Sequence, residues 1–163
     1  MVATERLVLR EAGTGDLTIL ERMWRDPVVR RHLGGPLSEE AVAARRSAGG
    51  VGGFMAELHS GEVVGWCHLG RYRTGELELS YAFLPGHWGR GYAREACGAI
   101  VGVAFESFPD DARLIAVTQE ANGRSVRLLE ALGMTRVDRF DEFGACQVRY
   151  ALDRPLAGRA GHP

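Results

Sequence analysis

The clearest hydrophobic pattern in the chain lies between residues 77 and 108. From Leu77 to Phe83, large apolar residues alternate with polar or small ones, which is the period of a half-buried β-strand. Pro85 and Gly86 stop this strand, because proline has no N–H for a ladder hydrogen bond. Beyond Gly91, apolar residues recur at the spacing of a helix face: Ala93, Cys97, Ile100, Ala104 and Phe108. The segment therefore predicts a strand, a glycine turn and a helix.

The same two periods organise the rest of the chain. Alternation predicts strands at 6–10, 54–58, 63–69, 114–118, 134–141 and 145–152. Helical spacing predicts helices that begin after the N-cap residues Asp16, Ser38 and Asn122, the last of them ended by Gly133. This order predicts an α+β fold with a mixed, mostly antiparallel sheet of about seven strands, flanked by about four helices.

Length and composition indicate one ordinary globular domain. We expect a single domain over residues 1–152, followed at 153–163 by a flexible tail rich in glycine, alanine and proline. The net charge is −1, and all twenty basic residues are arginine, scattered along the chain. Such a balance predicts neither a nucleic-acid nor a membrane partner. No basic leader and no apolar run of about 20 residues is present, so we expect a cytoplasmic protein.

The three cysteines predict neither a disulfide framework nor a metal site. Cys67, Cys97 and Cys146 are odd in number, far apart and in no CxxC pair, as is usual in a reducing compartment. Each lies in an apolar strand or helix, which favours buried packing over catalysis.

The glycine turn at residues 88–93 has the pattern of a phosphate-binding loop. The first amides of a helix have no carbonyl partner, and glycine lets an anion approach them closely. A dinucleotide loop would need a third glycine where Arg94 stands, and a Walker loop would need a lysine. By itself, the turn is also compatible with a tight connection that binds nothing, so a second motif is needed.

The sequence of this turn, Trp-Gly-Arg-Gly-Tyr-Ala, resembles the pyrophosphate loop of the GNAT N-acetyltransferase superfamily, whose pattern is R/Q-x-x-G-x-G/A. Trp88 occupies the first slot, a departure similar to the RimJ/RimL-like branch of ribosomal-protein N-terminal acetyltransferases. The preceding strand, Glu78 to Pro85, also resembles that branch, as does the opening Thr4 to Glu11.

A second motif follows the strand at 114–118. Asn122 and Ser125 begin the predicted helix, where they would serve as a cap and a first-turn residue in any protein. The segment from Asn122 to Met134 nevertheless resembles the GNAT pattern N-x-x-S/A-x-x-L-x-x-x-L-G-F/M. It also lies one strand beyond the glycine turn, as in that superfamily.

The resemblance implies acetyl-CoA, or a related acyl-CoA, as the acyl donor and a primary amine as the acceptor, without a metal. The backbone amides of one segment would hold the pyrophosphate: Trp88, Gly89, Arg90, Gly91, Tyr92 and Ala93. Asn122 and Ser125 would contact the pantetheine arm or the thioester. An amide near Phe83 or Leu84 would polarise the thioester carbonyl.

Attack by an amine requires a neutral nitrogen, so a general base helps. The resemblance implies Glu78 as this base, with Glu76, expected on the same face of the same strand, as the second choice. Many GNAT enzymes carry a tyrosine general acid where this chain has Leu129, and Ser125 is the alternative proton donor for the leaving sulfur. His87, beside the loop, is a further candidate for contact with phosphate or substrate.

Two functions remain open at this point. The first is an N-acetyltransferase acting on a protein or peptide α-amine or on a small-molecule amine. The second is a non-catalytic acyl-CoA-binding sensor or partner module, favoured by the missing tyrosine. Arginines at 25–35 and 71–75 suit a carboxylate-bearing acceptor or simply face solvent. Either a monomer or a homodimer is compatible with the sequence.

Overall fold

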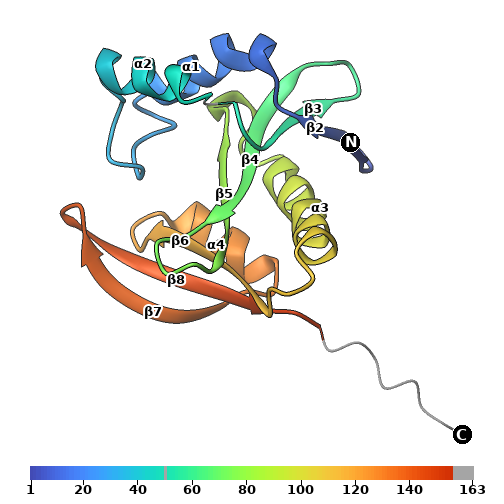
Figure 1. Ribbon diagram of the computed structural model, residues 1–163, viewed down its shortest axis with the longest axis vertical. Helices are drawn as coiled ribbons and strands as arrows, with labels where there is room; N and C mark the ends of the chain where they lie inside the picture. Colours follow the sequence, from blue (N-terminus) through green and yellow to red (C-terminus); the bar gives the residue numbers. More distant parts are fainter. Residues whose placement is uncertain (50, 156–163) are drawn as a thin grey trace, which may run out of the picture.

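The computed structural model describes residues 1–49 and 51–155, and it contains one open sheet with helices on both faces (Figure 1). The strands are β1 (Val2–Ala3), β2 (Leu7–Glu11), β3 (Phe54–Leu58), β4 (Val63–Arg71), β5 (Leu77–Phe83), β6 (Arg113–Gln119), β7 (Thr135–Glu142) and β8 (Ala145–Asp153). The helices are α1 (Leu17–Arg25), α2 (Glu39–Ser47), α3 (Tyr92–Ser107) and α4 (Gly123–Ala131), with short 3₁₀ turns at Thr14–Asp16 and Pro85–His87.

The strand order is β1-β2-β3-β4-β5-β6-β8-β7, and all neighbours are antiparallel except β5 and β6. The predicted α+β class and mixed sheet are therefore confirmed. Within the described residues the sheet has eight strands rather than about seven. The additional strand, β1, is two residues long and pairs with β2, and so short a segment has no readable period.

The two faces of the sheet carry different helices. Ala56 belongs to the main core, which joins β2 to β6 with α3. Its neighbour Met55 packs instead with Leu20 of α1 and Val42 of α2. Because successive strand residues point to opposite faces, α3 lies on one side and the α1–α2 pair on the other. α4 covers β6 and β8 beside α3 and completes the fold.

The predicted helix caps are partly confirmed. Ser38 accepts a hydrogen bond from the Ala41 N–H, and Asn122 accepts one from the Ser125 N–H. Asp16 is also at an N-cap, but its carboxylate accepts from the Gly13 N–H and pairs with Arg10 at 2.7 Å. The prediction that Asp16 caps α1 through its side chain was therefore wrong, because an arginine outcompetes the helix amides.

The start of the predicted tail is ordered. Asp153 ends β8, and the Arg154 guanidinium donates hydrogen bonds to the carbonyls of Phe105 and Phe108 at 2.7 and 2.6 Å. These two residues therefore belong to the fold, a correction to the predicted boundary at 153. The rest of the predicted tail, from residue 156, lies outside the described residues.

Two of the cysteines are buried as expected, and the third is not. Cys67 on β4 and Cys97 on α3 are fully buried, with their sulfurs 4.0 Å apart. Cys146 on β8 is only partly buried and lies 3.4 Å from Glu120. It occupies the strand as predicted, but it is not fully buried there. Among the described helices, none has the length and apolar character needed to cross a membrane.

Candidate active site

The turn between β5 and α3 is shaped by two glycines in the left-handed region. Gly89 has φ of 77° and Gly91 has φ of 83°, where an L side chain is strained. Gly91 is the N-cap of α3, and no side chain in the described chain bonds to the first amides of this helix. These donors are therefore left for a ligand, and the helix dipole favours an anion there.

The N-terminal segment braces this turn from the side. Arg6 donates from Nη1 to the carbonyl of Arg90 at 2.8 Å, and its Nε pairs with Glu95 on α3 at 2.7 Å. The Thr4 hydroxyl donates to the same Glu95 carboxylate at 2.6 Å. Glu95 thus fastens the first turn of α3 to the start of β2 and fixes the path of the glycine turn.

β5 and β6 separate toward the glycine turn. Their ladder pairs Leu77 with Leu114 and Glu78 with Ile115 and runs no further in the described chain. The Leu84 N–H donates to the carbonyl of Val64 on β4 at 2.9 Å. Because amide direction alternates along a strand, the Phe83 N–H points the other way, toward the gap beside β6.

That alternation tests the predicted oxyanion donor. The Leu84 amide is already satisfied by Val64, so it is excluded as a donor to the thioester carbonyl. Phe83 remains, and the alternation adds Tyr81, whose amide points to the same edge. The Phe83 carbonyl accepts a hydrogen bond from the Trp88 indole at 2.8 Å, which holds the loop against the end of the strand.

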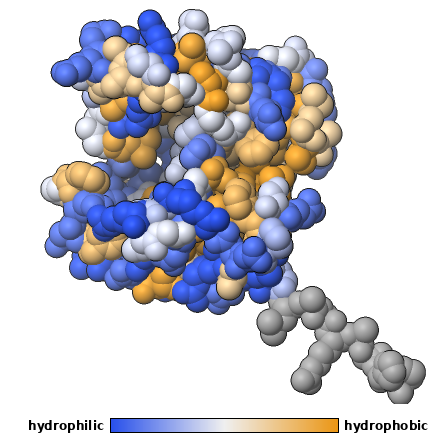
Figure 2. All heavy atoms as spheres, in the orientation of Figure 1, coloured by the Kyte–Doolittle hydropathy of each residue, from blue (hydrophilic) through white to orange (hydrophobic). Residues whose placement is uncertain are grey.

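A cavity of about 690 Å³ occupies the gap between the strands. In Figure 2 the surface is hollowed between the half that carries α1 and α2 and the half that carries β7 and β8. Most of the predicted donor-binding residues line this cavity: Phe83, Trp88, Gly89, Gly91, Tyr92, Ala93, Asn122 and Ser125. Leu84 and Arg90 do not line it, and Arg90 is exposed.

At the N-terminus of α4, Asn122 and Ser125 form a reciprocal pair. The Asn122 amide donates to the Ser125 hydroxyl at 3.1 Å and accepts from the Ser125 N–H at 3.3 Å. Tyr81 on β5 reaches the same hydroxyl: burial raises the pKa of the Tyr81 phenol, and a hydrogen bond with Ser125 offsets part of the rise. The sequence did not indicate this contact, because strand alternation gives no information on which helix end a side chain meets.

Three arginines in the cavity wall were also missed from the sequence. Arg94 belongs to the first turn of α3, and Arg124 and Arg127 belong to the first turns of α4. Arg124 lies over the Trp88 ring at 4.2 Å, so the two predicted motifs touch through a cation–π contact. In a chain whose basic residues are all arginine, nothing in the sequence distinguishes these three from solvent-facing ones.

The two candidate bases have different surroundings. Glu78 is half-buried on β5, and burial raises the pKa of its carboxyl. It lies on the sheet face that carries α1 and α2, two residues before Ser80, which lines the cavity. Glu78 itself does not line the cavity, so a bridging water is needed for contact with an acceptor there.

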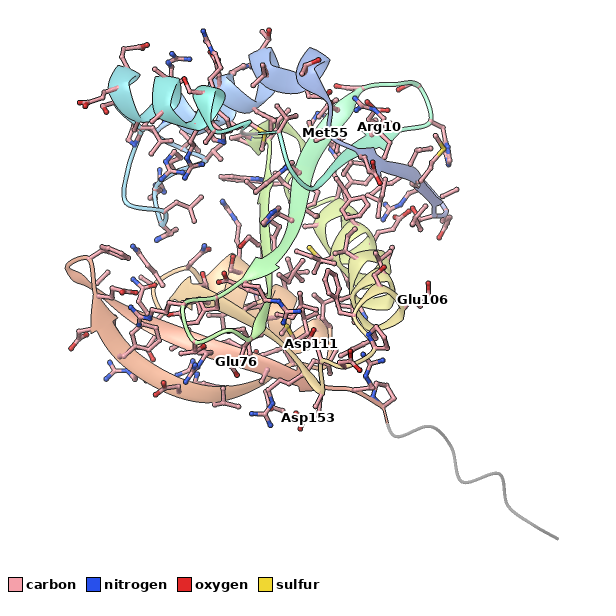
Figure 3. The ribbon with its side chains drawn as sticks, viewed as in Figure 1. Arg10, Met55, Glu76, Glu106, Asp111 and Asp153 are labelled. Atoms are coloured by element: carbon pink, nitrogen blue, oxygen red, sulfur yellow. The ribbon has the colours of Figure 1, made fainter. Side chains whose placement is uncertain are left out.

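Glu76, the second choice, lies directly before the strand that carries Glu78. β5 begins at Leu77, and the Glu76 carboxylate pairs with Arg149 at 3.1 Å and accepts from the Thr74 hydroxyl at 2.8 Å. Figure 3 shows Glu76 in the half of the molecule that holds β7 and β8, away from α1 and α2. Glu76 is thus one residue before β5, where its carbonyl accepts from the Tyr72 N–H at 2.9 Å in continuation of the β4–β5 pairing, and it does not line the cavity.

His87 is in the wall of the cavity, whereas Leu129 is in the core. His87 lines the cavity, with Nε2 3.3 Å from Glu62, and its buried Nδ1 has no partner among the described residues. Leu129, in the slot of the family's tyrosine, is fully buried in the core beneath α4. No general acid can act from that slot. Among the described residues, no cluster of three or more histidine, cysteine or acidic side chains could hold a metal ion.

A family model described as an acetyltransferase (GNAT) domain matches residues 6–135. The chain belongs to the GNAT acetyltransferase family. It is therefore an N-acetyltransferase with acetyl-CoA as its acyl donor. Both predicted motif regions lie within the matched residues.

Relatives of known sequence and structure agree with this assignment. An uncharacterized N-acetyltransferase, p20, of Bacillus licheniformis is 26% identical over 82% of this chain and 81% of its own length. The FsC-acetyl coenzyme A-N(2)-transacetylase of Aspergillus fumigatus is 30% identical over 84% of this chain and 66% of its own. The crystal structure of a GNAT-family acetyltransferase from Bacillus anthracis superposes with a TM-score of 0.80 at 25% identity, covering 93% and 97% of the two chains.

Proposed function

We propose that this GNAT enzyme transfers the acetyl group to a primary amine by direct attack within a ternary complex. The main support for this proposal is that the main cavity reaches both faces of the sheet. Its wall includes Gly89 and Ser125 at the helix N-termini and Val28 and Leu33 from the α1–α2 connection on the opposite face of the sheet. A donor and an acceptor entering from opposite faces would meet in the gap between β5 and β6.

The α3 side of the cavity suits the phosphates of the donor. The amides following Gly91 supply uncapped donors, and Gly89 has open space where a Cβ would stand. Arg94 and Arg127 in the wall add positive charge, and Arg124 stacked on Trp88 adds more. These features support a diphosphate site without a metal ion.

The chemistry takes place where the strands separate. The amine nitrogen attacks the thioester carbon, so a C–N bond forms while the C–S bond breaks. The Phe83 and Tyr81 amides, which point into the gap, stabilise the developing charge on the carbonyl oxygen. The proton of the attacking amine passes to Glu78 through a water, and the leaving sulfur takes a proton from the Ser125 hydroxyl.

Ser125 is well placed to relay this proton. Its hydroxyl accepts from the Asn122 amide and is in contact with Tyr81, from which it can recover a proton, and solvent then returns a proton to the Tyr81 phenolate. A thiol with a pKa of about 8.5 is also a fair leaving group without help. The absence of the family's tyrosine at Leu129 is thus compatible with turnover.

The finer assignment is to the RimJ/RimL-like branch, supported by Trp88 in the loop and by the Glu78–Pro85 strand. The acceptors that fit the proposal are a peptide α-amine or a small-molecule amine. At pH 7, about a tenth of the molecules of an α-amine with a pKa of about 8 are already neutral, so less proton removal by the base is needed.

A thiol-release assay with acetyl-CoA and a panel of primary amines tests the proposal, with Glu78→Gln as the matched variant. We expect turnover by the wild type and a loss of at least about a hundredfold in the variant. Acetyl-CoA at about a hundred times its dissociation constant should stabilise both proteins by about 2.7 kcal/mol, seen as a thermal shift. Stabilisation without turnover of any amine would favour the non-catalytic module, and equal turnover by the two proteins would remove Glu78 from the mechanism.

A further inference from the structure

A second, smaller cavity adjoins the main one on the α1–α2 face. It has a volume of about 210 Å³, and its outer wall is apolar, formed by Leu20, Met23, Trp24 and Trp66. Five residues line both cavities: Val29, Leu33, Ser80, Tyr81 and Ala82. The small cavity is therefore a side chamber that opens next to the gap where the acetyl group would be transferred.

The walls of this chamber are held in place before any ligand binds. The Trp66 indole donates to the Gly52 carbonyl at 2.7 Å, and its ring stacks on His68 at 5.5 Å. Trp24 is 8% exposed and packs in the α1–α2 core. A preformed apolar chamber favours an apolar group of matching size. A cavity of about 150 Å³ is known to hold a benzene molecule, so this one admits a group slightly larger.

The charges around both cavities have one sign. Arg30 and Arg45 line the side chamber, and Arg31, Arg94, Arg124 and Arg127 line the main cavity. No aspartate or glutamate among the described residues lines either one. Arg94, Arg124 and Arg127 are at the N-termini of α3 and α4, where the donor phosphates would bind. The other three, Arg30, Arg31 and Arg45, belong to α2 and the α1–α2 connection, on the face from which the acceptor would enter.

Arg30 and Arg45 share the chamber without a carboxylate between them. Arg30 uses Nε and Nη2 on the carbonyls of Gly35 and Leu33, which leaves Nη1. Arg45 lies over the Trp24 ring at 5.3 Å and has no ion-pair partner in the described chain. Burial, and then the charge of Arg45, lower the pKa of Arg30. An anion placed between the two guanidinium groups would offset their mutual repulsion.

Building on the proposed function, we propose that the acceptor is a small amine that carries a carboxylate and an apolar side chain of about benzene size. An apolar or aromatic α-amino acid is the simplest member of this class. Its carboxylate binds Arg30 and Arg45, its side chain fills the chamber between Trp24 and Trp66, and its amine lies by Ser80 and Tyr81 at the strand gap. Polycationic amines are disfavoured, because these walls offer them no carboxylate.

Amines that differ from phenylalanine in the carboxylate or in charge test the proposed acceptor class. The thiol-release assay compares phenylalanine with phenylalaninamide and phenethylamine, which lack the carboxylate, and with spermine as a polycation. We expect kcat/KM for phenylalanine to exceed that for each of the other amines by about ten- to a hundredfold. The amine of phenylalaninamide is less basic than that of phenylalanine, so more of it is in the reactive neutral form. This difference favours phenylalaninamide and therefore works against the expected preference for phenylalanine.

The Arg45→Met variant tests whether the Arg45 guanidinium binds the carboxylate. It removes the charge and keeps an unbranched side chain to pack on Trp24. We expect it to raise KM for phenylalanine by at least about tenfold, with kcat and the rate with phenethylamine little changed. Arg46→Met is the matched control, since Arg46 is the next residue on α2 but pairs with Glu21 and lines neither cavity. The thermal shift with acetyl-CoA should be the same in both variants.

The outcomes separate this inference from the proposed function. If no amine is turned over although acetyl-CoA binds, the proposed function fails. If amines are turned over but spermine or phenethylamine equals or exceeds phenylalanine, the acceptor class fails alone. If Arg45→Met and Arg46→Met behave alike while phenylalanine is preferred, the carboxylate is bound elsewhere and the assignment to Arg45 is overturned.

Discussion

Arg6 and Glu95 are 89 residues apart in the sequence and form a 2.7 Å ion pair that ties β2 to the first turn of α3. Arg6 also holds the Arg90 carbonyl in the glycine turn at 2.8 Å. The phosphate-binding geometry thus depends on the N-terminal segment as well as on the glycines. Neither residue stands out in the sequence by its spacing.

Removing this brace should weaken donor binding. We expect Arg6→Met to raise the KM for acetyl-CoA several-fold and to lower the free energy of unfolding by about 1 kcal/mol at pH 7, because the pair is partly exposed. Steady-state kinetics and thermal melting measure the two effects. Arg113→Met, which breaks an exposed pair with Asp153 far from the loop, is the control and should leave the KM unchanged.

The same pair sets a pH dependence. Burial of Glu95 acts to raise the pKa of its carboxyl, but hydrogen bonds from Thr4 and Arg6 outweigh it and leave the pKa lowered. A lowered pKa contributes stability above the unfolded value, about 4.3, and this stability is lost as the pH falls through the folded value. The melting difference between wild type and Arg6→Met should therefore shrink below about pH 4. A constant difference at all pH values would contradict this account.

Gly91 should tolerate no side chain. Its φ is 83°, and a Cβ there would be 3.2 Å from Nη2 of Arg6. We expect Gly91→Ala to destabilise the fold by about 1–2 kcal/mol and to raise the KM for acetyl-CoA. Gly102→Ala is the contrast: this glycine is in α3 with open space around it, and the change should stabilise the helix by about 1 kcal/mol. Two variants with the same melting temperature would refute the strain argument.

Glu78→Gln should separate activity from stability. Burial raises the pKa of Glu78, so the folded state binds its proton more tightly than the unfolded state. This stabilisation is present at low pH and is lost as the pH rises through the folded pKa. At neutral pH the variant should thus be at least as stable as the wild type while losing most of its activity. Because the base must be ionised, wild-type kcat/KM should fall on the acid side of that raised pKa.

Ser125→Ala should have a moderate effect. It removes the acceptor of the Asn122 amide and the contact with Tyr81, so we expect kcat to fall about tenfold and the melting temperature to drop slightly. Tyr81→Phe should lower kcat by a similar factor if the phenol returns the proton to Ser125. In the double variant the losses should be less than multiplicative, and independent losses would count against a relay.

Much of the fold was readable because local patterns agreed with each other. The alternation from Leu77 to Phe83, the glycines at 89 and 91 and the Asn122 cap each have one strong local interpretation, and the structure has these elements. Errors occurred where a side chain has a partner outside its own element. The Asp16 carboxylate pairs with Arg10 instead of the helix amides, and the Arg154 guanidinium donates to carbonyls at the end of α3.

The order of the elements, the glycine turn and the family could be read from the sequence, because these depend on residues close together in the chain. Which groups share the site became visible only in the folded protein. Folding brought Arg124 onto Trp88, placed Tyr81 against Ser125 and set Arg45 over Trp24 beside the strand gap. Side-chain contact between separate elements depends on strand pairing and helix packing, and local periodicity does not encode either of these.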